Sequence, residues 1–244
     1  MFADTLLDAI GAWQRGWGDN LVLRETLSQK LEGAASKLPQ EYKLVDQPCY
    51  RKRFIHKGEL VDVIMNDEKD EGLASWTTDI RYAERFKGYC REGAVTGALF
   101  RHIPEPGEVI LSLQRLWAST EFGAAAEDYR NRQGQEANAL FNFRDHQGEV
   151  VLKAPLKGSE IIGFTGASSP FDELCDRAEI PEQSRDRIFK NLIEKEIYPG
   201  EWGFTSGDLA RREQSAQRVV ADVVRAMNDK IAEAARQSLT LLTG

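Results

Sequence analysis

The sequence predicts an α+β fold in which an antiparallel β-sandwich is flanked by helical segments. Three observations support this class. Residues 1–46 carry apolar side chains at helical spacing, residues 47–167 divide into short β-rich segments separated by turns, and residues 168–244 return to helical spacing. We therefore expect an N-terminal helical segment, a central core and a C-terminal helical extension.

Two helices are predicted in the N-terminal segment. Apolar residues recur at helical spacing from Asp4 to about Trp17, where glycines on either side of the tryptophan interrupt the pattern. A second helix is predicted from Asn20 to Ser36, with leucines along its inner side. Both are interpreted as packing helices without a functional site of their own.

The central segment is predicted to consist of short strands with small helices inserted. We expect strands at Cys49–Ile55, Ala94–His102, Val109–Leu113 and Glu160–Phe164, a further apolar segment at Leu60–Met65, a helix at Tyr82–Tyr89, and a hairpin formed by Ala137–Phe143 and Val150–Leu152.

The C-terminal segment is predicted to be helical. Helices are expected at Phe171–Ala178, at Glu182–Ile197 and from Asp208 to about Leu241, the last with Thr205 or Ser206 as N-cap. Apolar residues form one face of this last helix. A face of this length suits an interface as well as packing within the chain, and the sequence leaves both readings open.

Composition limits the class of protein. The chain has 244 residues, 41% hydrophobic and 29% charged residues, and a mean hydropathy of −0.47, which is typical of an ordinary globular protein. Its net charge of −7 argues against a general nucleic-acid coat protein, although a local basic patch could still hold a nucleic-acid substrate.

The sequence also predicts where the protein is found. No signal peptide or apolar run of about 20 residues is present, so we expect no membrane partner and a cytoplasmic location; leaderless export would leave no trace of this kind. Cys49, Cys90 and Cys175 are scattered and odd in number, which favours buried thiols in a reducing compartment.

The sequence lacks the motifs of several common enzyme classes. The three histidines, His56, His102 and His146, stand apart, and no HExxH or Cys/His cluster is present, so no metal is expected. No P-loop, no GxGxxG before a helix and no GxSxG elbow occurs either.

Glu149 is the strongest candidate for chemistry. His146-Gln147-Gly148 is interpreted as a turn, and Glu149 begins a β-branched apolar run that is typical of a strand entering a core. The acid would then stand at the mouth of a strand. By itself this pattern also fits a glutamate that points into water.

Two upstream segments complete a candidate constellation. Arg51 lies in the basic strand Cys49–Ile55, where a guanidinium suits a phosphate or carboxylate; the alternative is an edge strand with solvated basic residues. Ser75 and Thr77 alternate on a short strand, so their hydroxyl groups point the same way. Asp79 suits an N-cap for the helix that follows.

Taken together, Tyr50-Arg51, Ser75-Trp76-Thr77 and Gln147-Gly148-Glu149 resemble the mono-ADP-ribosyltransferases. The resemblance is closest to the branch with the signature Arg, Ser-x-Ser/Thr and Gln/Glu-x-Glu. It covers about residues 47–166, and implies a split antiparallel β-sandwich core whose substrate is NAD.

The resemblance also implies a role for each residue. Glu149 would be the catalytic acid that stabilises the oxocarbenium-like transition state, and Gln147 would contact the acceptor. Arg51 would grip the NAD phosphates, and Ser75 would orient Glu149 or the nicotinamide ribose. Thr77 would support the pocket wall.

Three further residues near these motifs are candidates with open roles. Trp76 stands where the family commonly has a small residue, and either stacks on nicotinamide or packs behind the strand. Phe143 and His146 are candidates for acceptor specificity.

A second register competes with the first. Glu136-Ala137-Asn138 also resembles the Glu-x-Glu pattern, but with Asn138 in place of the catalytic acid, which would make the chain inactive. We prefer the later register because its acid is present and because Pro155 and Gly158 follow.

The resemblance implies a mono-ADP-ribosyltransferase that modifies a protein or nucleic acid, acting as a toxin, phage-related or defence factor, with an antitoxin or other partner protein as a further expectation. The alternatives are an NAD glycohydrolase of the same fold and an inactive binding module that associates through the last helix.

Overall fold

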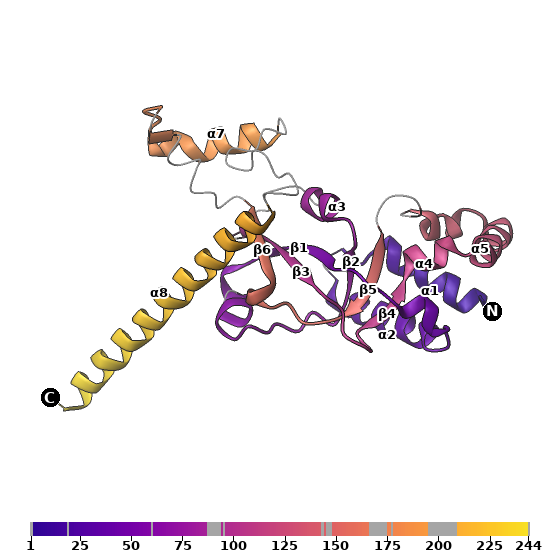
Figure 1. Cartoon of the computed structure of the whole chain (residues 1–244), viewed down its shortest axis with the longest axis horizontal. Helices are drawn as coiled ribbons and strands as arrows, with labels where there is room; N and C mark the ends of the chain where they lie inside the picture. The colour runs from indigo at the N-terminus through magenta and orange to yellow at the C-terminus, as the bar shows by residue number, and fades with distance from the viewer. Residues whose placement is uncertain are drawn as a thin grey trace. The chain divides into compact units, whose positions relative to one another are not determined.

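The computed structural model describes residues 2–18, 20–59, 61–86, 94, 96–142, 144, 148–165, 175–176, 178–194 and 209–243. The fold is α+β, and its six strands form one open antiparallel sheet in the order β4-β5-β2-β1-β3-β6 (Figure 1). The predicted α+β class and antiparallel pairing are therefore confirmed, whereas the split β-sandwich stays a prediction. The chain forms two compact units, and both β1 and β3 contribute residues to each of them. The predicted division into three consecutive segments stays a prediction.

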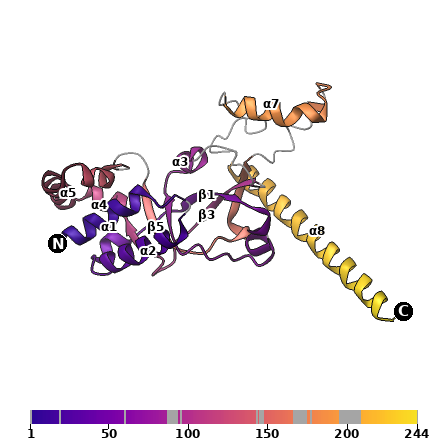
Figure 2. The ribbon, with the colours of Figure 1, turned by 180° about the vertical axis from the view of Figure 1, so that it is seen from behind.

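The first unit comprises Met1–Arg51, Asp70–Glu84 and Arg101–Pro155. Its two N-terminal helices are α1 (Asp4–Arg15) and α2 (Leu21–Ala35), close to the predicted bounds. Asn20 caps α2 by accepting a hydrogen bond from the backbone N–H of Leu23, which satisfies one of the open donors of the first turn. Figures 1 and 2 show α1, α2 and α4 on one side of β5 in both views.

The strands of the first unit determine which side chains share a face. β2 (Leu73–Thr77) pairs with β5 (Glu149–Lys153), and β5 pairs with β4 (Val109–Ser112). β1 (Cys49–Ile55) pairs with β2, with Tyr50 opposite Thr77. Thr77 in turn lies opposite Glu149. Residues directly opposite one another in a sheet share a face, so Tyr50, Thr77 and Glu149 lie on the same face.

The segment between β4 and β5 is helical, and the predicted hairpin of Ala137–Phe143 with Val150–Leu152 is wrong. It contains α4 (Leu113–Ala118), α5 (Thr120–Gln133) and the 3-10 helix η4 (Gly134–Phe141). In η4 the buried Ala137 and Leu140 lie three residues apart, which is a helical spacing, and Leu140 packs near Gly11 of α1.

Short helices join the remaining elements of the first unit. α3 (Ile80–Arg85) follows β2, and Asp79 accepts a hydrogen bond from the backbone N–H of Arg81 at 2.9 Å, as expected of the predicted cap. The 3-10 helix η1 (Gln40–Lys43) lies between α2 and β1.

The second unit comprises Lys52–Lys69, Arg85–Phe100 and Leu156–Gly244. In it β3 (Thr96–His102) pairs antiparallel with β6 (Ile161–Thr165), and the predicted apolar segment after β1 forms the π-helical turn η3 (Val61–Met65). Its other elements are η2 (Lys57–Glu59), η5 (Gly158–Glu160), α7 (Glu182–Glu194) and α8 (Leu209–Thr243).

Gln217 ties the root of α8 to this unit. Its side-chain Nε2 lies 3.3, 3.2 and 2.7 Å from the carbonyl oxygens of Gly158, Ser159 and Ile161. Beyond Met227, residues 228–238 of α8 are exposed (the long yellow helix in Figure 1). The predicted helix Phe171–Ala178 and the N-cap candidates Thr205 and Ser206 fall wholly or largely outside the described residues.

Membrane-spanning helices and metal clusters are both absent from the described part of the chain. No helix in this part of the chain is long and apolar enough to cross a membrane. Among the same residues, no group of three or more His, Cys, Asp or Glu side chains is arranged to hold a metal ion.

Candidate functional site

Gly148 holds the backbone that presents Glu149. Its φ of +50° lies in the left-handed region, which a residue with a Cβ adopts only at a cost. The carbonyl oxygen of Gly148 accepts a hydrogen bond from the backbone N–H of Thr78 at 3.1 Å. A Cβ at position 148 would lie 2.2 Å from Thr78 Oγ1. The close approach of this turn to the residue after β2 therefore favours glycine.

Glu149 is the centre of a buried hydrogen-bond network. Its side chain is 6% exposed, and its Oε1 accepts a hydrogen bond from Ser75 Oγ at 2.7 Å. Its Oε2 accepts from Gln14 Nε2 at 3.1 Å. Trp13 Nε1 donates to Ser75 Oγ at 2.9 Å. An acid, a hydroxyl group, an amide and an indole from three distant parts of the chain thus form one connected cluster.

The directions of these hydrogen bonds follow from the chemistry of the groups. An indole nitrogen can only donate, so the hydroxyl oxygen of Ser75 accepts from Trp13. The hydroxyl hydrogen of Ser75 is then available for Glu149. Ser75 consequently acts as a donor of fixed direction toward the carboxyl group.

Burial controls the electrostatics of the cluster. Removal of Glu149 from water raises the pKa of its carboxyl group, and the hydrogen bonds from Ser75 and Gln14, together with the nearby indole N–H of Trp13, oppose that rise. Tyr82 of α3 is affected by the same charge. Burial first, and then the negative charge of Glu149, raise the pKa of its phenol group.

Arg51 lies close to the cluster but contacts it through the backbone. The alternation of side chains along β1 places it on the opposite face from Tyr50, and hence from Glu149. Its NH1 donates to the carbonyl oxygen of Ser75 at 2.7 Å, and its NH2 donates to Glu71 Oε2 at 3.2 Å. Glu71 is almost fully buried and forms a salt bridge with the guanidinium.

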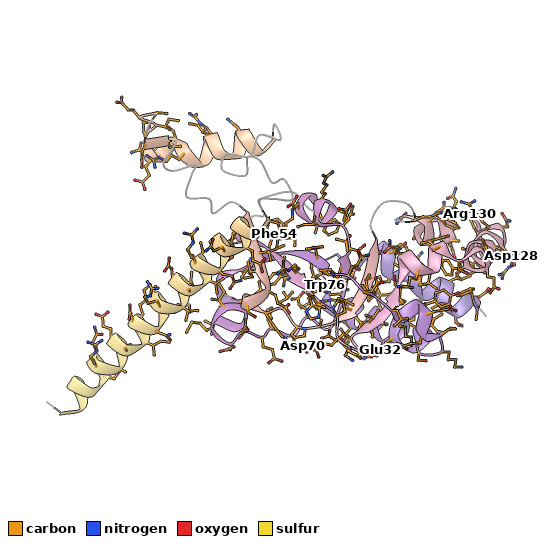
Figure 3. The ribbon with its side chains drawn as sticks, in the orientation of Figure 1. Glu32, Phe54, Asp70, Trp76, Asp128 and Arg130 are labelled. Carbon is orange, nitrogen blue, oxygen red and sulfur yellow. The ribbon has the colours of Figure 1, made fainter. Side chains whose placement is uncertain are left out.

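Trp76 lies on the face away from Glu149. It stands opposite Val150, is 2% exposed, and has its ring centroid 5.6 Å from that of His102. Figure 3 labels Trp76 amid the strands. Of the two roles predicted for this residue, its position agrees with packing behind the strand.

Thr77 lies directly opposite Glu149 and is buried. Its Oγ1 accepts a hydrogen bond from the backbone N–H of Asp79 at 3.0 Å, which holds the turn between β2 and α3. The hydroxyl group therefore stabilises this turn, and its predicted role in the pocket wall stays a prediction.

The structure also separates the two competing registers. Asn138 is an exposed residue of the 3-10 helix η4, whereas Glu149 begins β5 beside the strand that carries Ser75. The preferred register is thus the one in which the acidic position meets the serine motif. Gln147, Phe143 and His146 lie outside the described residues.

Trp13 and Gln14 were not predicted as site residues, because α1 was interpreted only as a packing helix. A signal was present in the sequence. Gln14 falls four residues after Ile10 and seven after Leu7, so a polar side chain occupies a position of the buried stripe. Tyr82 had no comparable signal, because its proximity to Glu149 depends on the turn before α3.

Comparisons with known proteins gave no match: no family model, no curated protein and no solved structure is similar to this chain. Function is therefore inferred from the chemistry of the site.

Proposed function

We propose that this protein is a mono-ADP-ribosyltransferase, which cleaves the nicotinamide–ribose bond of NAD and transfers ADP-ribose to a protein or nucleic-acid acceptor. One observation carries the proposal: Ser75 of the Ser-x-Thr motif donates a 2.7 Å hydrogen bond to Glu149 of the Gln-x-Glu motif. Two segments 74 residues apart, which were singled out for the same chemistry, are thereby joined.

The sheet supports the same proposal. In its order β5, β2 and β1 are neighbours, and these are the strands that carry Glu149, the Ser75–Thr77 motif and Arg51. We propose on this ground that the strands form the split β-sandwich core of the transferase family.

The reaction makes specific demands on the acid. When the bond between C1′ of the ribose and the pyridinium nitrogen breaks, its electron pair leaves with nicotinamide, and positive charge develops on the ribose ring. An ionised Glu149 stabilises that charge, and its effect is larger in a site with little water. The acceptor then attacks C1′ and loses its proton. Water in place of the acceptor gives hydrolysis.

Arg51 has a conditional role in this proposal. Arg51 lies on the face of the sheet opposite to Glu149, and its guanidinium pairs with Glu71 at 3.2 Å, so the NAD diphosphate would have to reach that face and displace this carboxylate. The contact from Arg51 to the carbonyl oxygen of Ser75 means that any shift of the arginine also acts on the serine strand.

The test is release of nicotinamide from NAD by the purified protein. Glu149→Gln should abolish release while leaving the fold intact. Glu136→Gln is the matched control, because Glu136 is the exposed acid of the competing register, and should keep full activity. Full activity in Glu149→Gln would refute the assignment of the acid, and no release by the unaltered protein would refute the proposed function.

The acceptor is identified with labelled NAD in a cell lysate. Label that protease removes indicates a protein acceptor, and label that nuclease removes indicates a nucleic acid. Label that stays in free ADP-ribose would show that the protein is a glycohydrolase and not a transferase.

A further inference from the structure

We propose that Gln14 is a positioning residue for Glu149, and that its amide turns over when the carboxyl group takes up a proton. The amide would then hold Oε2 of Glu149 in both protonation states. This deepens the proposed function, and it rests on that function only for its effect on NAD cleavage.

A proton on Glu149 has one preferred oxygen. Because Trp13 occupies Ser75 Oγ as a donor, the hydroxyl hydrogen of Ser75 is directed to Oε1 of Glu149. Oε1 is therefore the permanent acceptor of the carboxyl group. A proton taken up by Glu149 belongs on Oε2, which faces Gln14 at 3.1 Å.

The Gln14 amide has one end without a partner in the described part of the chain. Gln14 is 8% exposed, its Nε2 donates to Glu149, and its Oε1 is buried without a hydrogen-bond partner in the described part of the chain. A half-turn of the amide exchanges the two atoms. Either orientation leaves one amide atom unpaired, so the surrounding fold favours neither orientation strongly. The protonation state of the Glu149 carboxyl group therefore determines which orientation the amide takes.

The Gln14 amide has a different orientation in each protonation state of Glu149. Ionised Glu149 can only accept, so Gln14 Nε2 faces it and donates. Protonated Glu149 donates from Oε2, so Gln14 Oε1 faces it and accepts. The hydrogen bond to the ionised form is charge-assisted and is the stronger of the two. Gln14 consequently favours the ionised form, which the proposed reaction uses.

Other groups near Glu149 do not replace this function. Trp13 and Ser75 donate in fixed directions, and Thr77 is neutral. Tyr82 is titratable, but burial and the charge of Glu149 raise its pKa, so it stays neutral near pH 7. From β1, Tyr50 lies opposite Thr77, and the cationic Lys52 follows on the same face of that strand.

The decisive measurement uses the unaltered protein. The side-chain amide signals of Gln14 in NMR spectra should change with pH, with the same midpoint as the carboxyl carbon of Glu149. In Glu149→Gln this change should disappear. Amide signals that do not follow the titration of Glu149 would overturn the proposal, and no variant at position 14 needs to fold for this result.

Two variants test the positioning role. Gln14→Met conserves volume but cannot form a hydrogen bond, and should lower the acid dissociation constant of Glu149 by about threefold to tenfold. The acidic limb of the pH–rate profile of NAD cleavage should move to higher pH by about 0.5–1 pH unit, which corresponds to the same change in the dissociation constant. Gln29→Met is the matched control, because Gln29 donates to Glu25 at 2.9 Å on the exposed side of α2.

The outcomes separate the two proposals. An unchanged midpoint for Glu149 in Gln14→Met, or an equal change in Gln29→Met, would overturn the role of Gln14. If the unaltered protein releases no nicotinamide, the proposed function fails, while the titration of Glu149 and Gln14 still decides this inference.

Discussion

Replacement of Gly148 by alanine tests how the fold presents the acid. Gly148 has a φ of +50°, and a Cβ there would lie 2.2 Å from Thr78 Oγ1. The same Cβ would lie 3.5 Å from Thr78 Cβ, which is an ordinary contact. The variant therefore suffers backbone strain and a clash with one side-chain atom, and the two effects can be measured separately.

The cost of Gly148→Ala follows from these two effects. A left-handed backbone at a residue with a Cβ costs about 1–2 kcal/mol. Thr78 Oγ1 must also move away from Gln114 and from the carbonyl oxygen of Gly148, its acceptors at 3.4 and 3.5 Å, which adds about 1 kcal/mol. We expect a loss of about 2–3 kcal/mol in the free energy of unfolding, measured by urea denaturation with tryptophan fluorescence.

Gly72→Ala is the matched control for the strain alone. Gly72 has a φ of +58°, and a Cβ there would meet no atom within 4 Å. It should cost only the 1–2 kcal/mol of the backbone. In the double variant Gly148→Ala with Thr78→Ala, the clash should vanish and the cost of the glycine substitution should fall to that level. Equal losses for the Gly148→Ala and Gly72→Ala single variants would refute the close approach of the turn to β2.

Three further substitutions have defined outcomes. Glu149→Gln should be more stable than the unaltered protein at pH 7. Because the pKa of Glu149 is raised in the folded state, the folded protein loses stability as pH rises from about 4.3 toward that pKa. Denaturation at several pH values should show this loss in the unaltered protein and not in the variant. Gly11→Ala should raise the melting temperature and add about 0.5–1 kcal/mol to the free energy of unfolding, because alanine favours the helix. Its Cβ would lie in ordinary contact, 3.6–4.0 Å from atoms of Leu140, so a lower melting temperature would contradict this packing. Gln217→Met should accelerate hydrogen exchange in the first turns of α8, because the three carbonyl oxygens near Nε2, including that of Ile161, lose their shared donor. Unchanged exchange in these turns would contradict the role of Gln217 in attaching the helix.

Much of the fold follows from local patterns in the sequence. The strand Cys49–Ile55 was predicted with its observed bounds, because Tyr50 and Phe54 alternate with basic residues, and Pro48 and Gly58 lie on either side of the segment. The helices α1, α2 and α8 were predicted within a few residues, since their apolar residues recur at helical spacing over several turns.

The segment between β4 and β5 was harder to predict for a physical reason. α5 buries only a few side chains, including Phe122 and Tyr129, and its remaining surface is polar or alanine, so its periodicity is weak. η4 is a 3-10 helix whose spacing over eight residues resembles a strand as readily as a helix. No element was predicted for residues 114–136.

The site was predicted in part. Glu149, Ser75 and Thr77 come together because the register of two adjacent strands brings their motifs side by side, as alternation along each strand suggests. The contacts of Glu149 with Gln14, and of Arg51 with Glu71, depend on how α1 and the turn before β2 pack. Such long-range contacts leave no periodic pattern in the chain.

The attachment of α8 has a mechanical consequence. Gln217 ties the root of the helix to the residues that lead into β6, while residues 228–238 extend from it as a stiff exposed rod. A load applied near Thr243 acts at the end of a long lever arm, and its torque is resisted at the root of the helix by the amide of Gln217 and the buried Ala216 and Val220. Pulling on this helix should therefore loosen the edge strand β6 before it unwinds the helix itself.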